Sequence, residues 1–443
     1  MGKIVKRLSS AQIIILGFAG VILFGSLLLM LPFSTQNGQG AAFTDALFTS
    51  TSAVCVTGLV VRDTATYWTG FGQAVILMLI QIGGMGVITV AAAIFIASGK
   101  KISLKQRSTM QEAISAHQVG GIVRLTGFII KMTICFELLG AVFMFPVFYR
   151  EFGIGKGLWY AIFHSISAFC NAGFDLMGCK TPYSSLTYFA ADPVINLVIT
   201  ALIVIGGIGF ITWDDVKTKG LHIHKYRMQS KVILMTTFCL LLFPALYFLA
   251  FEFSDGPLSE RVLSALFQSA TPRTAGFNTV DLRDISETGI VIMIFLMLVG
   301  GSPGSTAGGM KTTTLAVLFS TAVSVFRYRE HTHFFGRRID DDTVRNAVAV
   351  LIMYMTMFLG GGLLISRIEG LPILDCLYET ASAVATVGLT LGITPELSLP
   401  SRAILVLLMY IGRVGGLTLI FAASSGKRKG NTARLPQEKL TVG

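Results

Sequence analysis

The sequence is poor in charge and carries no pattern of metal or disulfide ligands. Only 13% of its 443 residues are charged, whereas about a quarter of the residues of a soluble protein are charged. This scarcity argues against a soluble globular enzyme. The six cysteines form no Cys-x-x-Cys pair and no short Cys/His spacing, so we expect neither a zinc site nor a disulfide framework.

Hydrophobic residues make up 53% of the chain, and many of them lie in long runs. A bilayer core about 30 Å thick needs roughly 20 apolar residues in a helix. Eight runs meet this need: 11–31, 70–97, 122–149, 193–213, 228–251, 285–326 (interrupted), 343–367 and 401–424. The first run lacks an Ala-x-Ala cleavage site and is predicted to be a retained helix. We therefore expect an all-α, multi-pass protein of the cell membrane with eight transmembrane helices.

The basic residues predict how these helices are oriented. With the N-terminus inside, 22 of the 35 lysines and arginines fall in segments on the cytoplasmic side and eight fall outside, as short cytoplasmic loops require. Both termini are then cytoplasmic. The net charge of +11 indicates attraction to anionic membrane lipids or, in addition, a docking surface for a cytosolic partner. Nucleic-acid binding needs a soluble basic surface and is not expected.

A shorter apolar stretch ending in a glycine lies between the two spans of each pair. The four stretches read Asp45-ALFTSTSAVCVT-Gly58, Tyr160-AIFHSISAFCNA-Gly173, Leu263-SALFQSATPRTA-Gly276 and Asp375-CLYETASAVATV-Gly388. Their glycines are 115, 103 and 112 residues apart. We expect four repeats of span, short helix, glycine turn and span, over residues 1–110, 111–220, 221–338 and 339–426, followed by a basic cytoplasmic tail at 427–443.

The short helix of each repeat, about ten residues long, cannot cross the bilayer. The backbone after it would leave unpaired amide and carbonyl groups, so it must be enclosed by protein or line a watery cavity. Four copies around one axis would enclose a pore, and the negative ends of the helices would favour a cation there. The alternative is that the glycines only allow close helix packing, but four glycines in register favour turns that present carbonyl oxygens.

The fourth turn resembles the start of a potassium-channel filter, TVGYG, since it reads Thr386-Val387-Gly388, although Leu389 stands in place of tyrosine. One glycine per repeat, four unlike repeats and eight spans resemble the Trk/Ktr/HKT superfamily of potassium transporters, most of all the membrane subunit of bacterial Ktr systems. The resemblance implies potassium uptake through a gated pore whose filter carbonyls lie around Val56, Thr57, Gly58, Asn171, Ala172, Gly173, Thr274, Ala275, Gly276, Thr386, Val387 and Gly388. In the family, glycine at the position of Gly58 goes with potassium permeation.

A long glycine-rich segment interrupts the sixth run and reads Gly300-GSPGSTAGG-Met310-Lys311. It is no Walker motif, because Met310 separates glycine from lysine. A polar break at membrane depth must line a cavity. By the resemblance it is the gate, formed by Gly304, Ser305, Thr306, Ala307, Gly308, Gly309, Lys311 and Arg413.

Arg413 occupies the place that Gly84, Gly207 and Gly301 hold in the other repeats. An arginine at this depth is costly and should face the interior. Three roles remain open: it repels cations, it latches the loop through carbonyl contacts, or it forms a buried ion pair. Of the other charges, we expect Arg273 to pair with an acidic neighbour, and Asp45 and Asp375 to cap their short helices.

The resemblance also implies partners: a second copy of the chain in a homodimer, and a cytosolic ring of nucleotide-binding regulatory subunits that moves the gate. Potassium is then the substrate, sodium a possible activator, and no cofactor is expected. The alternative function is a cation-coupled secondary transporter with alternating access. Four units that all run in the same direction argue against it. A membrane-embedded enzyme is not expected, because no paired carboxylates or Ser/His arrangement occurs at membrane depth.

Overall fold

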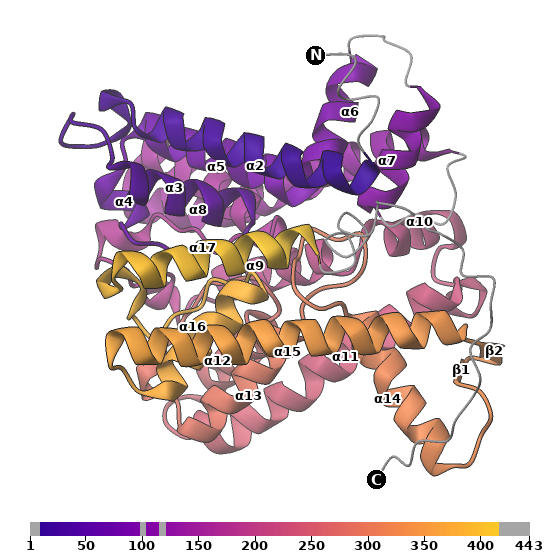
Figure 1. Cartoon of the computed structure of the whole chain (residues 1–443). Coiled ribbons are helices and arrows are strands. Elements are labelled where there is room, and N and C mark those ends of the chain that lie inside the picture. Colours follow the sequence, from indigo (N-terminus) through magenta and orange to yellow (C-terminus); the bar gives the residue numbers. More distant parts are fainter. Residues whose placement is uncertain (1–8, 98–102, 115–120, 416–443) are drawn as a thin grey trace.

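The computed structural model describes residues 9–97, 103–114 and 121–415, and these are mostly helical. Figure 1 shows the long helices running side by side across the molecule. The basic tail at 427–443 and the end of the last predicted run lie outside the described residues, as do the basic residues before Ser9.

Four helices are long and apolar enough to cross a membrane: α2 (Ser10–Leu29), α8 (Ile122–Phe169), α11 with its π-helical end (Met228–Glu252) and α15 (Asp341–Glu369). Two pairs are each bent at a short break, by 97° between α5 (Gly70–Met85) and α6 (Val87–Ala97) and by 95° between α9 (Pro193–Gly207) and α10 (Phe210–Lys219). The described part therefore contains four spans, or six if each bent pair counts as one. The protein is a helical, multi-pass membrane protein.

The remaining predicted runs hold shorter helices. The sixth run divides into α13 (Glu287–Leu298) and α14 (Thr312–Phe326), and the eighth begins as α17 (Leu399–Val414). The bends of the paired helices coincide with glycine, because Gly86 and Gly209 have φ of 84° and 94°, a conformation that side chains with a β-carbon resist. Both bends thus lie at glycines in the break between two helices.

A short helix precedes each of the four aligned glycines. Three are separate helices, α3 (Phe43–Val54), α12 (Leu258–Ala270) and α16 (Ile373–Val384). The second is the end of α8, where Gly153 at φ 75° breaks the helix. Each separate short helix packs against the long helix before it, namely α3 on α2, α12 on α11 and α16 on α15.

Close packing holds these short helices against the second helix of the same repeat. A β-carbon added at Gly83, Gly206 or Gly412 would collide with a carbonyl oxygen at the end of the short helix. The partners are Val54, Phe169 and Val384, each four residues before the aligned glycine of its repeat. The small residues therefore allow the backbones to touch, as is common in membrane helices.

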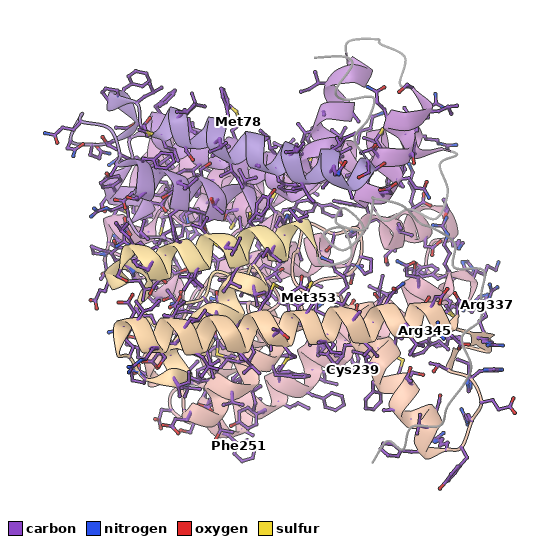
Figure 2. All side chains as sticks on the ribbon, viewed as in Figure 1. Met78, Cys239, Phe251, Arg337, Arg345 and Met353 are labelled. Carbon is purple, nitrogen blue, oxygen red and sulfur yellow. The ribbon has the colours of Figure 1, made fainter. Side chains whose placement is uncertain are left out.

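The other elements are short. They are α4 (Thr64–Tyr67), α7 (Leu104–Ile114), a hairpin of β1 (His333–Phe334) and β2 (Arg337–Arg338), and the 3-10 turns Pro32–Ser34, Met177–Cys179, Thr187–Phe189, Ile223–Lys225, Leu282–Asp284 and Thr394–Glu396. Figure 1 places α6, α7, α10 and the hairpin at one end of the molecule, opposite α3 and α4. Large apolar side chains such as Met78 and Phe251 point outward (Figure 2) and are exposed, as lipid-facing residues are.

Candidate ion-conduction site

The four aligned glycines form a closed ring. A β-carbon added to any of them would strike the carbonyl oxygen of the residue that precedes the next aligned glycine. For the fourth glycine, this is the residue before the first glycine. The pairs are Gly58 with Ala172, Gly173 with Ala275, Gly276 with Val387 and Gly388 with Thr57. The separation would be 2.5 Å at Gly58 and 2.8 Å at Gly173. Four segments more than a hundred residues apart thus meet backbone to backbone, and only glycine fits between them.

The backbone of the ring has an unusual conformation in all four repeats. Positive φ occurs at each ring glycine and again two residues earlier, at Val56 (57°), Asn171 (58°), Thr274 (66°) and Thr386 (53°). Three of these are β-branched, for which positive φ is costly. In a β-strand successive carbonyl groups point to opposite sides, whereas alternating the sign of φ can turn them to one side, as an ion filter needs.

Hydroxyl groups at the ends of the short helices support this backbone, and the sequence analysis missed them. Ser52 Oγ accepts from Gly58 N at 3.0 Å, and Ser382 Oγ accepts from Gly388 N at 2.9 Å. Ser167 Oγ donates to the Phe174 carbonyl oxygen at 2.7 Å, and Thr271 Oγ1 donates to the carbonyl of Phe277. The signal is present in the alignment, since the serine lies six residues before the glycine in three repeats.

Three further hydroxyls of the ring segments are buried without a hydrogen-bond partner: those of Thr57, Thr274 and Thr386. A buried polar group normally has a partner. The described residues contain no group of three or more His, Cys, Asp or Glu that could hold a metal ion. The ring segments themselves offer backbone carbonyl oxygens, which can replace the water shell of an alkali ion.

The third repeat departs from the others behind the ring. Arg273 is buried and donates only a long hydrogen bond, 3.4 Å, to Thr237 Oγ1. No ion pair of the described residues includes Arg273, so the expectation of an acidic neighbour was wrong. Its carbonyl oxygen lies 3.4 Å from the Asn171 side chain, which ties the second repeat to the third.

The glycine-rich segment between α13 and α14 lies directly against the ring. The Thr306 hydroxyl is 3.0 Å from Asn171 Oδ1 and 3.1 Å from the Phe169 carbonyl oxygen. A β-carbon at Gly308 would strike Thr386 Oγ1. The segment therefore touches the second and fourth repeats at the residues that begin the ring.

The same segment is also tied to the break between α9 and α10. Ser302 N donates to the Gly207 carbonyl oxygen at 3.0 Å, and Phe210 N donates to that of Gly304 at 2.7 Å. Peptide groups freed by the bend thereby find partners in the loop, as buried backbone groups must. Movement of the loop away from the break between α9 and α10 would separate these partners.

Arg413 of α17 also forms a hydrogen bond with the loop. Its guanidinium donates to the Thr306 carbonyl oxygen at 2.5 Å and to the Gly83 carbonyl oxygen at 2.5 Å. Arg413 takes part in none of the ion pairs found among the described residues. Of the three roles left open by the sequence, the contacts thus exclude the buried ion pair and agree with the latch.

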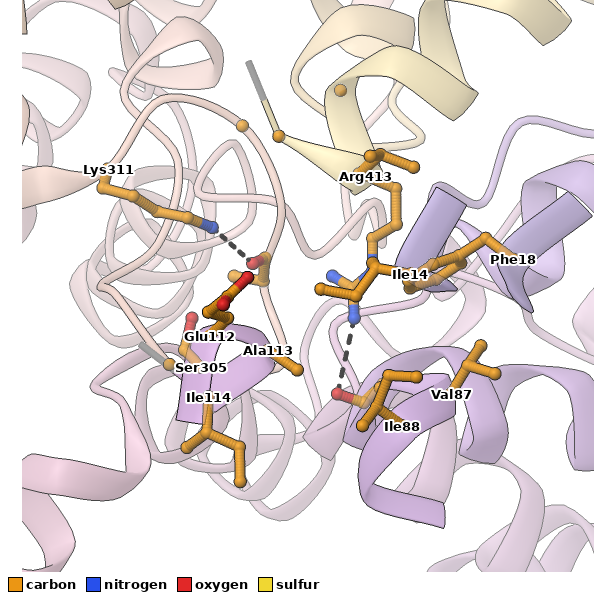
Figure 3. Close-up of a pocket in the computed structure, with 18 of the residues that line it drawn as sticks. Ile14, Phe18, Val87, Ile88, Glu112, Ala113, Ile114, Ser305, Lys311 and Arg413 are labelled. Carbon is orange, nitrogen blue, oxygen red and sulfur yellow. Dashed lines mark hydrogen bonds between the residues drawn. The ribbon is translucent and has the colours of Figure 1, made fainter. Parts of the chain in front are cut away.

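Lys311 is the second cation of this region. Its Nζ donates to the carbonyl oxygens of Ala307 (2.9 Å) and Gly308 (3.2 Å). Figure 3 shows both cations at a cavity of about 250 Å³ that Glu112 and Ser305 also line. All eight residues of the predicted gate thus lie together, next to the predicted filter.

The two aspartates predicted to cap the short helices do not occupy the capping positions. The N-terminal ends of α3 and α16 lack a side-chain cap, and Asp45 and Asp375 lie inside the first turn. Asp45 is buried and instead pairs with Arg62 at 2.8 Å and with Arg402 at 3.2 Å. The capping interpretation was therefore wrong for both.

Comparison with known proteins agrees with this arrangement. Residues 10–431 match the family model described as "TrkH: Cation transport protein". The chain is 39% identical to the potassium/sodium uptake protein NtpJ of Enterococcus hirae and 37% identical to the Ktr system potassium uptake protein B of Bacillus subtilis, each time over 100% of this chain and 99% of the relative.

The crystal structure of the potassium transporter TrkH from Vibrio parahaemolyticus shares the fold. The TM-score is 0.69 at 22% identity, over 91% of this chain and 84% of that one. The relatives are ion transport proteins and not enzymes. The chain belongs to the TrkH family of cation transport proteins.

Proposed function

We propose that this chain takes up potassium through a gated pore whose filter is the glycine ring. The observation that carries the proposal is the closed succession of four glycines, each against a carbonyl oxygen of the next repeat. Such a ring can exchange the water shell of a potassium ion for carbonyl oxygens. The twelve filter residues predicted from the sequence are the ring glycines and the two residues before each.

The proposed membrane arrangement has eight spans in four repeats, with boundaries near residues 110, 220 and 338. Four long helices and two bent pairs give six spans. The pair α13 and α14, counted as one span, and α17 bring the number to eight. Every repeat then places its short helix on one side of the membrane, and both termini are cytoplasmic. Four units that run in the same direction favour a pore over a transporter with rocking inverted halves.

The loop of residues 304–309, with Lys311 and Arg413, is the proposed gate. Thr306 contacts Asn171 of the second repeat, and Arg413 contacts Gly83 of the first. Movement of the loop out of the proposed pore would therefore require these contacts to break together. Two cationic groups without a carboxylate partner in the described part would also oppose the passage of a cation.

The proposed assembly is a homodimer of this chain with a cytosolic ring of nucleotide-binding regulatory subunits on its basic face. The name of one group of relatives, the Ktr system proteins, supports a system of several components. Sodium is a proposed activator, since the name of another relative includes it.

The test is potassium-limited growth of uptake-deficient cells that express the chain, either unchanged or with Gly58→Ser or Gly388→Ser. We expect the unchanged chain to restore growth and each serine to reduce growth or the preference for potassium over sodium. Gly360→Ser is the matched control, because a β-carbon at Gly360 on α15 meets nothing within 4 Å. Normal growth and selectivity of both filter variants would overturn the proposal.

A further inference from the structure

A second cavity lies at the end of the molecule that carries the β1–β2 hairpin. It has a volume of about 350 Å³ and is lined by the loop between α10 and α11, the start of α11 and the hairpin. Five cationic side chains line it: Lys219, Lys225, Arg227, Lys231 and Arg337. Figure 2 shows Arg337 projecting at this end of the molecule.

Carboxylates neutralise only two of the five cations. Buried Asp215 accepts from Lys219 Nζ at 2.6 Å, and Asp214 lies 3.1 Å from the Arg227 guanidinium. The other three, Lys225, Lys231 and Arg337, have no ion pair within the residues that the structure describes. The cavity therefore has an excess of three positive charges facing one space.

An apolar stripe begins where the cavity ends. Lys231 shares one face of α11 with Met235, Phe238 and Leu242, because these residues are spaced by four, three and four. Met235 and Phe238 are each 62% exposed. Leu221, in the loop between α10 and α11, is 93% exposed. The basic cavity is thus continuous with an apolar surface that runs along a membrane span.

We propose that the cavity binds the phosphate headgroup of an anionic phospholipid in the cytoplasmic leaflet, with an acyl chain along the α11 stripe. Lysine ammonium groups bind phosphate as point charges, and arginine binds it through two parallel hydrogen bonds. A free phosphate would leave the stripe uncovered. An acidic protein surface would match the charge but not an apolar strip at membrane depth.

The proposal rests on the orientation proposed above, which places the hairpin end in the cytoplasm, but not on potassium conduction. Basic cavities at the inner membrane surface attract anionic lipids, and each basic side chain adds to the attraction. The site lies away from Arg413 and Lys311 and shares no lining residue with their cavity. Lipid binding can therefore be measured whether or not the chain conducts.

The experiment is native mass spectrometry of the purified full chain titrated with phosphatidylglycerol or phosphatidylcholine. The pocket variant is the triple change K225Q/K231Q/R337Q. Its matched control, R327Q/R329Q/R345Q, removes the same charge from arginines that do not line the cavity. We expect tight retention of phosphatidylglycerol by the unchanged chain and the control, and about a tenfold or greater loss in the pocket variant.

Four results would overturn the proposal. Three are an equal loss in both triple variants, no preference for phosphatidylglycerol over phosphatidylcholine, and displacement of the lipid by an equal concentration of inorganic phosphate, which would indicate a free anion. A fourth is lipid retention by a pocket variant that no longer binds an acidic cytosolic partner. Should the triple variant fail to fold, the single change R337Q on the exposed hairpin replaces it, with a smaller loss expected.

Discussion

At the scale of single residues, the ring depends on side chains that do not line it. Ser52 and Ser382 accept hydrogen bonds from the amide groups of ring glycines, and the Asn171 side chain lies between Arg273 and the Thr306 hydroxyl of the glycine-rich loop. Three β-branched residues of the ring segments have positive φ, a strained conformation that persists only where the surroundings enforce it. The geometry of the ring is therefore a property of the supporting residues as well as of the glycines.

Loss of one supporting hydroxyl should weaken selectivity. Ser382→Ala leaves the buried amide of Gly388 without its partner, at a cost of about 1–3 kcal/mol. We expect the preference for potassium over sodium to fall by about fivefold or more, as measured by ion flux into proteoliposomes. Ser382→Thr keeps the hydroxyl and should restore selectivity. The control Thr356→Ala removes an exposed hydroxyl on α15 and should change nothing.

Substitution of Arg413 separates its two remaining roles. Both Arg413→Gln and Arg413→Lys lose the planar fork that reaches the carbonyl oxygens of Thr306 and Gly83 at once, but lysine keeps the positive charge. We expect both to raise potassium flux measured without a regulatory subunit, because the contacts hold the loop closed. If lysine keeps the flux as low as arginine does, repulsion of cations is the role and the latch is wrong.

At the scale of elements, the segment that follows the third ring glycine is interrupted differently from those that follow the first and second ring glycines. The bent pairs α5–α6 and α9–α10 turn at a single glycine, whereas α13 and α14 are separated by the loop from Val299 to Lys311. A single glycine is enough for a bend. The longer loop contacts two other repeats, the second and the fourth, through hydrogen bonds and close backbone contacts, so its length serves contact with the ring and not the bend.

Shortening this loop tests the gate directly. Deletion of Ser305–Gly308 removes the contacts to Asn171 and Arg413 while α13 and α14 remain. We expect a several-fold higher flux in proteoliposomes that contain no regulatory subunit. Thermal unfolding and size-exclusion profiles must match those of the unchanged chain. A folded deletion variant with equal or lower flux would show that the loop is not the barrier.

At the scale of the whole molecule, the first and last repeats close the ring. Gly388 lies against the Thr57 carbonyl oxygen. Asp45 of α3 forms an ion pair with Arg402 of α17, which follows more than 350 residues later in the chain. Arg402 also donates to the carbonyl oxygens of Leu397 and Pro395 at 2.8 Å. This cluster joins α17 to α3 and to the turn Thr394–Glu396.

Removal of this link should loosen the closed ring. Arg402→Gln takes away a charged hydrogen bond to a buried carboxylate, worth about 1.5–3 kcal/mol. We expect a fall of several degrees in the thermal transition of the detergent-solubilised chain. Lys180→Gln is the control, since its pair with Glu151 is about one-third exposed on both sides, and exposed pairs contribute little. Equal shifts in both variants would contradict the role assigned to Arg402.

The sequence by itself determined the composition of the membrane-spanning segments and the register of the repeats, because these depend on local apolar length and on glycine spacing. It placed Gly58, Gly173, Gly276 and Gly388 and the glycine-rich loop before any contact was known. Only the tertiary structure decided which carbonyl each glycine meets, that Arg413 bonds to carbonyls instead of a carboxylate, that Asp45 pairs with Arg402, and that Ser382 supports the ring. These contacts join residues far apart in the chain, and their geometry depends on how the helices pack, which local pattern does not encode.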